Sequence, residues 1–205
     1  MLICLEFMER RALEQLSTQS SGFITYAQVI AAGLDPHALR AGVDAGWLER
    51  VQRGVYRLSN AGIQPFEAML ELQLRLPYAV ISGSSALAVH GLTTFMPKII
   101  EVSVPRNKHP PRLEYPRMTV SYLASAAYLH GQQTMDLGGA SLTVYTMERT
   151  LADLLRESKR AGSTLFAEGF KAYLQRGPPK VRALLEAARV RRLEPAMRDL
   201  LEMIA

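Results

Sequence analysis

Residues 22–58 read GFITYAQVIAAGLDPHALRAGVDAGWLERVQRGVYRL, and this stretch decides the fold of the N-terminal part of the chain. Phe23-Ile24 is a very short β-prone segment. Thr25 is a good N-cap for the helix that follows it, and Gly33 ends that helix. The dipeptide Asp35-Pro36 then predicts a second helix, with Asp as its cap and Pro at its first position.

A predicted hairpin follows the second helix, which runs to about residue 45. Residues 47–51 and 55–58 are β-prone, and the turn between them ends in Gly54, which can adopt a positive φ. A helix over residues 8–17 precedes the whole segment. The order helix, short strand, helix, tight turn, helix and hairpin predicts a winged helix-turn-helix, with the hairpin as the wing.

The second helix of the pair has the two faces that a DNA-recognition helix needs. Leu39 and Val43 form its buried face, whereas Arg40 lies on the opposite face, where its two-pronged donor geometry suits guanine. We expect Trp47 to be a core residue that anchors the wing. We expect the helix and the wing to contact DNA through His37, Arg40, Arg50, Gln52, Arg53, Tyr56 and Arg57.

The rest of the chain predicts a second domain of mixed composition. Residues 60–65 are a plausible linker, so we expect a winged-helix domain over 1–60 and a second domain over 61–205. In the second domain we expect a helix over 66–76, strands over 79–82, 99–104, 118–123 and 142–145, and helices over 86–90, 146–157, 164–176, 179–192 and 195–204. Strands come first and helices last, so the predicted fold class is α+β.

Basic residues are unevenly distributed along the chain. Residues 1–60 hold six basic and six acidic side chains, residues 61–155 hold seven of each, and residues 156–205 hold eleven and six. The whole excess of five positive charges therefore lies at the C-terminal end, which suits an acidic partner or DNA. The candidate partner-binding residues there are Lys159, Arg160, Lys171, Arg176, Lys180, Arg182, Arg189, Arg191 and Arg192.

Four segments together resemble a known protein family. Residues 22–33 and 48–58 resemble the N-terminal domain of AbiEi-type antitoxin regulators. Residues 82–92 (SGSSALAVHGL) and 146–154 (TMERTLADL) are similar to two landmarks of that family's second domain. The resemblance implies a bacterial antitoxin of a type IV toxin–antitoxin pair. Its N-terminal domain would bind repeats in its own promoter and repress the operon, and its C-terminal domain would counteract a nucleotidyltransferase-type toxin.

An enzyme is the first alternative, because Gly83-Ser84-Ser85 lies between a predicted strand and a predicted helix. This arrangement looks like the phosphate-binding opening of a nucleotidyltransferase site. Such a site also needs paired carboxylates for magnesium, but the next strand offers only Glu101, with Ser103 at the second position. We therefore expect a non-catalytic domain with no metal and no cofactor. A winged helix that binds only protein is the second alternative.

Other single residues favour structural roles over catalytic ones. His90 has no assigned nucleophile or orienting acid, so we expect it to pack under a loop. Glu148 suits the first turn of a helix, and Arg149 and Asp153 can pair at i, i+4. One cysteine, no long apolar run and a poor match of residues 1–7 to a signal peptide predict a cytoplasmic protein without a membrane segment; Met8 is an alternative start.

Overall fold

The computed structural model describes residues 2–18, 22–61, 66–136, 141–161 and 164–203, and for residues 2–7, 52 and 159–161 it describes only the backbone. The chain forms two compact units. The first comprises Met1–Leu70 with Asp136–Ser141, and the second comprises Glu71–Met135 with Leu142–Ala205. Most of the predicted linker, residues 62–65, lies outside the described residues.

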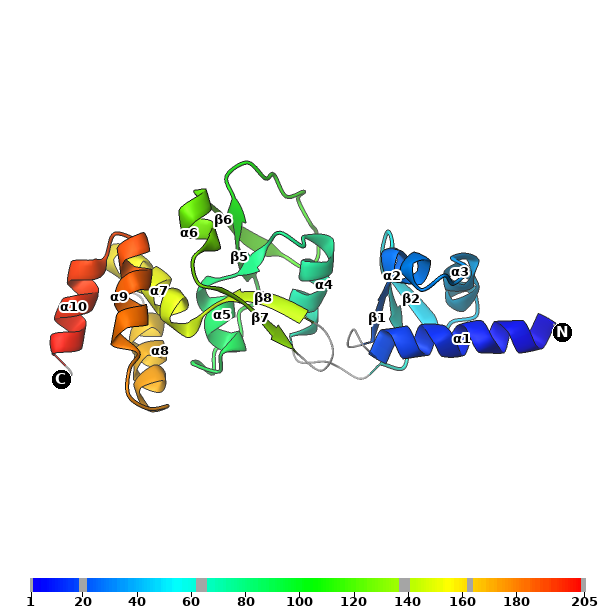
Figure 1. Cartoon of the computed structure of the whole chain (residues 1–205), viewed down its shortest axis with the longest axis horizontal. Coiled ribbons are helices and arrows are strands. Elements are labelled where there is room, and N and C mark those ends of the chain that lie inside the picture. The colour runs from blue at the N-terminus through cyan, green and yellow to red at the C-terminus, as the bar shows by residue number, and fades with distance from the viewer. Residues whose placement is uncertain (1, 19–21, 62–65, 137–140, 162–163, 204–205) are drawn as a thin grey trace. The chain divides into compact units, whose positions relative to one another are not determined.

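The first unit has the element order that the sequence predicts. It contains α1 (Leu2–Thr18), β1 (Phe23–Thr25), α2 (Tyr26–Ala31), α3 (His37–Asp44), β2 (Leu48–Gln52) and β3 (Val55–Leu58). The strands form an antiparallel sheet in the order β1-β3-β2, against which the three helices are grouped (Figure 1). Leu13, Ile24, Val29, Leu39 and Leu48 form its buried core.

Local signals fix the two helices of the pair. Thr25 caps α2 in a capping box: its hydroxyl accepts a hydrogen bond from the Gln28 backbone, and its own N–H donates to the Gln28 side chain at 2.7 Å. The start of α3 differs slightly from the prediction, because the helix begins at His37 with Pro36 as N-cap. The Asp35 carboxylate still accepts a hydrogen bond from the His37 N–H at 2.9 Å.

The second unit combines a five-stranded sheet with helices. Its strands are β4 (Val80–Ile81), β5 (Ile100–Pro105), β6 (Met118–Leu123), β7 (Gln132–Asp136) and β8 (Ser141–Tyr145), in the order β6-β5-β4-β8-β7. β4 runs antiparallel to β5 and parallel to β8, and β5 runs parallel to β6. The helices are α4 (Glu67–Arg75), α5 (Gly83–Val89), α6 (Ser125–Leu129), α7 (Met147–Ala161), α8 (Thr164–Leu174), α9 (Val181–Val190) and α10 (Glu194–Glu202). The part of α4 up to Leu70 belongs to the first unit.

Two clusters of contacts hold the second unit together. α4 is tied to β8 through buried Gln73, whose side chain accepts a hydrogen bond from Thr143 N–H at 3.1 Å. The helices α7 to α10 pack beside one another (Figure 1), around a core that includes Leu87, Leu151, Phe170 and Met197. The predicted α+β class, with a winged helix first and helices last, is therefore confirmed.

Three details of the sequence-based prediction for this unit were wrong. The short helix expected from residue 86 begins at Gly83, so Gly83-Ser84-Ser85 is its first turn and not a loop. The sequence also missed α6 and β7, which carry mostly exposed or half-buried side chains and no strong apolar periodicity. The long stretch between β5 and β6 is an irregular loop, as its prolines predict.

Candidate nucleic-acid interface

The outer face of α3 is exposed, as a recognition helix requires. His37, Arg40, Ala41 and Asp44 are all exposed, whereas Leu39 is buried in the core. The Arg40 side chain is 86% exposed, and its Nε lies 3.9 Å from the Asp44 carboxylate. An exposed pair at this distance contributes little stability. Arg40 can therefore leave Asp44 for a base edge at little cost.

The wing is a tight hairpin whose tip presents Arg53. Gly54 has a φ of +76°, a conformation that most L-residues avoid, and its carbonyl accepts a hydrogen bond from the Tyr26 N–H at 2.8 Å. A register shift lies between Arg50 and Gln52. Arg50 and Arg53 are exposed, and Gln52 has no described side chain. The tip is thus fixed to the start of α2 while its arginines face solvent.

Two predicted DNA contacts also have structural roles within the first unit. Tyr56 packs against the core. Arg57 is three-quarters buried and forms ion pairs with Glu67 and with Glu49, the latter at 3.3 Å between Nη2 and Oε2. These contacts hold β3 in place. Both residues therefore have less freedom to reach DNA than Arg40 or Arg53.

Trp47 occupies the position expected of an anchor. It packs against the core of the first unit, and the Arg10 guanidinium lies 5.2 Å from the centre of its ring. The carbonyl of Trp47 accepts a hydrogen bond from Ser59 N–H at 3.0 Å. These contacts join α1 and the base of the wing to the end of α3.

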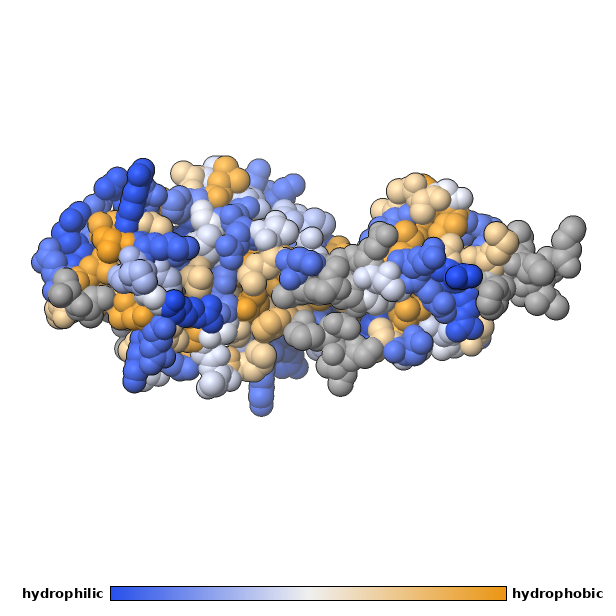
Figure 2. Space-filling view, turned by 60° about the horizontal axis from the view of Figure 1, so that its bottom comes forward, coloured by the Kyte–Doolittle hydropathy of each residue, from blue (hydrophilic) through white to orange (hydrophobic). Residues whose placement is uncertain are grey.

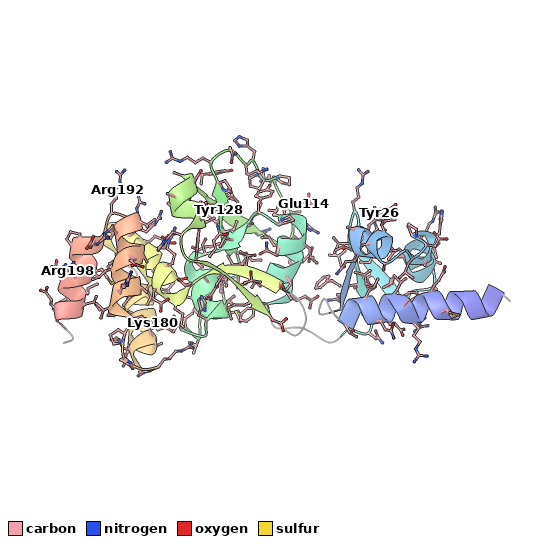
Figure 3. The ribbon with its side chains drawn as sticks, in the orientation of Figure 1. Tyr26, Glu114, Tyr128, Lys180, Arg192 and Arg198 are labelled. Atoms are coloured by element: carbon pink, nitrogen blue, oxygen red, sulfur yellow. The ribbon has the colours of Figure 1, made fainter. Side chains whose placement is uncertain are left out.

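Sequence reasoning missed Tyr26, the first residue of α2. Its side chain is 48% exposed and points outward beside the wing (Figure 3). The first helix of such a pair crosses the DNA backbone, so an exposed tyrosine at its start is a candidate phosphate contact. The signal in the sequence was its position directly after the Thr25 cap.

Several of the described basic residues near the C-terminus are paired with carboxylates. Arg182 pairs with Glu186 at 2.9 Å, and Arg189 pairs with Glu194 at 2.7 Å. Lys180 lies 3.6 Å from Glu148. Hydrophilic residues cover much of the helical part of the second unit, at the left of Figure 2. Among the described residues, these pairs leave fewer cations for a partner than the composition suggests.

The remaining predicted partner-binding residues fall into two groups. Arg176 and Arg191 serve the fold: Arg176 donates to the carbonyl of His90 at 2.6 Å, and the largely buried Arg191 lies 2.5 Å from Asp153. Lys171 and Arg192 are exposed. Arg192 lies just past the end of α9, and Lys180 lies just before its start (Figure 3). The side chains of Lys159 and Arg160 lie outside the described residues.

The nucleotidyltransferase-like segment, residues 83–85, binds a carboxylate from the same chain. Glu101 on β5 accepts hydrogen bonds from the backbone N–H of Ser84, at 3.3 Å, and from its hydroxyl. Its own N–H donates to the Ser85 hydroxyl at 2.9 Å. A Cβ at Gly83 would overlap the Glu101 carboxylate. Glu101 thus takes the donors that a phosphate would need.

The described residues include no group of three or more His, Cys, Asp or Glu side chains that could hold a metal ion. Within the same part of the chain, no helix is both long and apolar enough to cross a membrane.

Residues 11–59 match the family model of the AbiEi antitoxin, a transcriptional regulator. The match begins in α1 and ends just after β3, so it confirms the resemblance over the winged helix. Among solved structures, the crystal structure of the RV2827C protein from Mycobacterium tuberculosis shares the fold, with a TM-score of 0.51 and 18% identity over 94% of this chain and 80% of that chain. No curated protein matches the chain.

The second AbiEi-like landmark, residues 146–154, builds a buried network around Arg149. Its guanidinium is fully buried, donates to the carbonyls of Ala127 at 2.6 Å and His130 at 2.7 Å, and pairs with Asp153 at 3.2 Å. It also lies 4.3 Å from the centre of the Tyr145 ring. The predicted i, i+4 pair is confirmed. The landmark therefore joins α6, β8 and α7.

The first AbiEi-like landmark, residues 82–92, has a similar structural role. His90 is buried, and its Nε2 lies 2.6 Å from the carbonyl of Tyr145. Burial lowers the pKa of His90, and the nearby Arg176 adds to this effect. A neutral imidazole that donates from Nε2 fits both observations. His90 was expected to pack under a loop; it is buried, and its partner is the last residue of β8.

Proposed function

We propose that the chain is a DNA-binding transcriptional autorepressor and an antitoxin that acts in the cytoplasm without catalysis of its own. The observation that carries this proposal is the exposure of Arg40 on α3 and Arg53 at the wing tip, within a segment that matches the AbiEi regulator family. Residues 1–60 would bind double-stranded DNA at repeats in the chain's own promoter.

The exposed residues have distinct roles in this proposal. Arg40, with His37 beside it, enters the major groove and reads base edges, where a bidentate arginine contact to guanine contributes about 1–3 kcal/mol of discrimination. Arg53 contacts phosphate or the minor groove from the wing, with Arg50 and Gln52 beside it. Arg57 and Tyr56 keep the wing in position.

The antitoxin role belongs to residues 61–205 in this proposal. The partner is a nucleotidyltransferase-type toxin, and the exposed cations Lys171 and Arg192 are available to an acidic surface. The Glu101 carboxylate, which contacts the first turn of α5, disfavours the alternative that this domain is a nucleotide-using enzyme. Cells that express the toxin should regain growth when this chain is co-expressed. The variant with both Arg40 and Arg53 replaced by alanine should restore growth equally well.

The experiment that tests the DNA contacts compares arginine substitutions on the chain's own upstream DNA. Arg53→Ala should make the plot of log K against log salt shallower by about 0.9, the value of one phosphate contact. Arg40→Ala should lower affinity for the specific site about 5- to 150-fold and relax base preference. Arg11→Ala is the matched control, because Arg11 is an exposed arginine on α1. Equal behaviour of all three variants would contradict the assignment.

A further inference from the structure

One edge of the second unit's sheet is the strand β6. It pairs with β5 on one side, and among the described residues the strand order gives it no neighbour on the other. An unpaired edge strand presents backbone donors and acceptors that another strand can use.

The hydrogen bonds to β5 settle which backbone groups face outward. Ile100 N–H donates to the Arg117 carbonyl at 2.9 Å, and Arg106 N–H donates to the Leu123 carbonyl at 3.0 Å. The odd-numbered residues from 117 to 123 therefore point their backbone groups toward β5. Because this direction alternates along a strand, the N–H and C=O groups of Met118, Val120 and Tyr122 point away from the sheet.

The composition of β6 lacks the usual protection of an exposed edge. Its sequence, MTVSYL, contains no charged residue, no proline and no glycine. Stable monomers commonly place lysine, proline or a bulge on such a strand, because an uncharged edge invites pairing. Tyr122 is 48% exposed, and Ile99, beside the start of β5, is 46% exposed. The edge is therefore uncharged as well as unpaired.

A second copy of the strand fits this edge in antiparallel orientation. With a two-fold axis at Val120, that residue lies opposite itself, and Met118 lies opposite Tyr122 of the other copy. Each of these pairs joins residues whose backbone groups point outward, so each pair can exchange both N–H···O bonds. On the other face Thr119 lies opposite Ser121, a favourable hydroxyl pair.

The absence of charge along β6 favours a second copy, because no like charges meet when the strand pairs with itself. The groove beside β6 has a volume of about 1160 Å³ and is lined by the loop before the strand, which carries Arg112, Glu114 and Arg117. Both signs are therefore present at the rim of each copy; Glu114 is labelled in Figure 3. An isologous contact needs such a self-complementary surface.

We propose that two copies of the chain associate through antiparallel pairing of their β6 strands, centred on Val120, and so form one continuous sheet across a two-fold axis. This contact lies entirely in the second unit. It does not depend on the proposed DNA-binding function.

The test is the mass of the full chain in solution, measured by sedimentation equilibrium from micromolar to millimolar concentration. The wild type should approach twice the 22.8 kDa of one chain. Val120→Pro should raise the dimer dissociation constant about tenfold or more, because proline removes an outward N–H. The sheet should tolerate this change, because the lost N–H is not bonded to β5.

A second pair of variants keeps the test decisive if Val120→Pro does not fold, which circular dichroism would reveal. Val120→Lys places two lysines opposite each other at the axis and should also leave a monomer. Thr119→Lys, on the other face and opposite a serine, is the matched control and should still dimerise. A wild type that stays monomeric, or a dimer that survives both folded Val120 variants, would overturn the proposal.

Discussion

Replacing Arg149 by methionine should destabilise the second unit severely, because this side chain satisfies several buried groups at once. The substitution keeps most of the side-chain volume but removes the donors to the carbonyls of Ala127 and His130. A buried acceptor left without a donor costs about 1–3 kcal/mol. Asp153 would keep Arg191, 2.5 Å away, so it would not become an unpaired buried charge.

The expected loss of unfolding free energy is about 2–6 kcal/mol, because two buried acceptors lose their donor at about 1–3 kcal/mol each. For a chain of this size that corresponds to a fall in the melting temperature of roughly 4–24 °C. The assay is differential scanning calorimetry of the full chain. Arg149→Lys should fall between the wild type and Arg149→Met, because lysine keeps the charge but lacks the planar fork of donors.

The matched control for this prediction is Arg182→Ala. Arg182 also pairs with a carboxylate four residues away, but its side chain is 91% exposed. Its removal should leave the melting temperature nearly unchanged. If Arg149→Met lowered the melting temperature no more than Arg182→Ala, the structural role given to the buried network would be wrong.

Two further predictions concern the first AbiEi-like landmark. Gly83→Ala should lower the free energy of unfolding, measured by urea titration, more than Gly33→Ala does. Both glycines have a positive φ, and an alanine there costs about 1–2 kcal/mol for that reason alone. Only at Gly83 would the added Cβ also displace the Glu101 carboxylate. Equal losses would contradict the close approach. His90 has a lowered pKa in the folded protein, so the unfolded chain binds more protons as the pH falls below the ordinary value of 6.5. Stability should therefore fall on acidification below that pH, and His90→Gln should flatten this part of the profile; identical profiles would mean that His90 is not buried neutral.

The winged helix was predictable because its signals are local. The Thr25 cap, the positive φ of Gly33 and the turn at Gly54 each depend on residues a few positions apart. The apolar spacing in α3 also placed Leu39 inside and Arg40 outside. The exposure of Arg53 followed from its place at the tip of the predicted turn.

The remaining features depend on contacts between distant residues, which a single sequence does not reveal. Gly83-Ser84-Ser85 forms a helical turn because Glu101 reaches it from the next strand. The C-terminal excess of basic residues predicted a partner surface, but Arg191 forms an ion pair with Asp153, which lies 38 positions earlier in the sequence. The sequence likewise does not show that Arg57, a predicted DNA contact, pairs with Glu67.

The most direct test of the central claim is a mobility-shift titration of the purified chain on its own upstream DNA, with random DNA as competitor. At about 150 mM salt non-specific binding is weak. The account predicts a sharp shift that random competitor does not remove and that Arg40→Ala and Arg53→Ala both weaken. No specific shift by the folded wild-type chain would contradict the claim that its winged helix is a DNA-binding repressor domain.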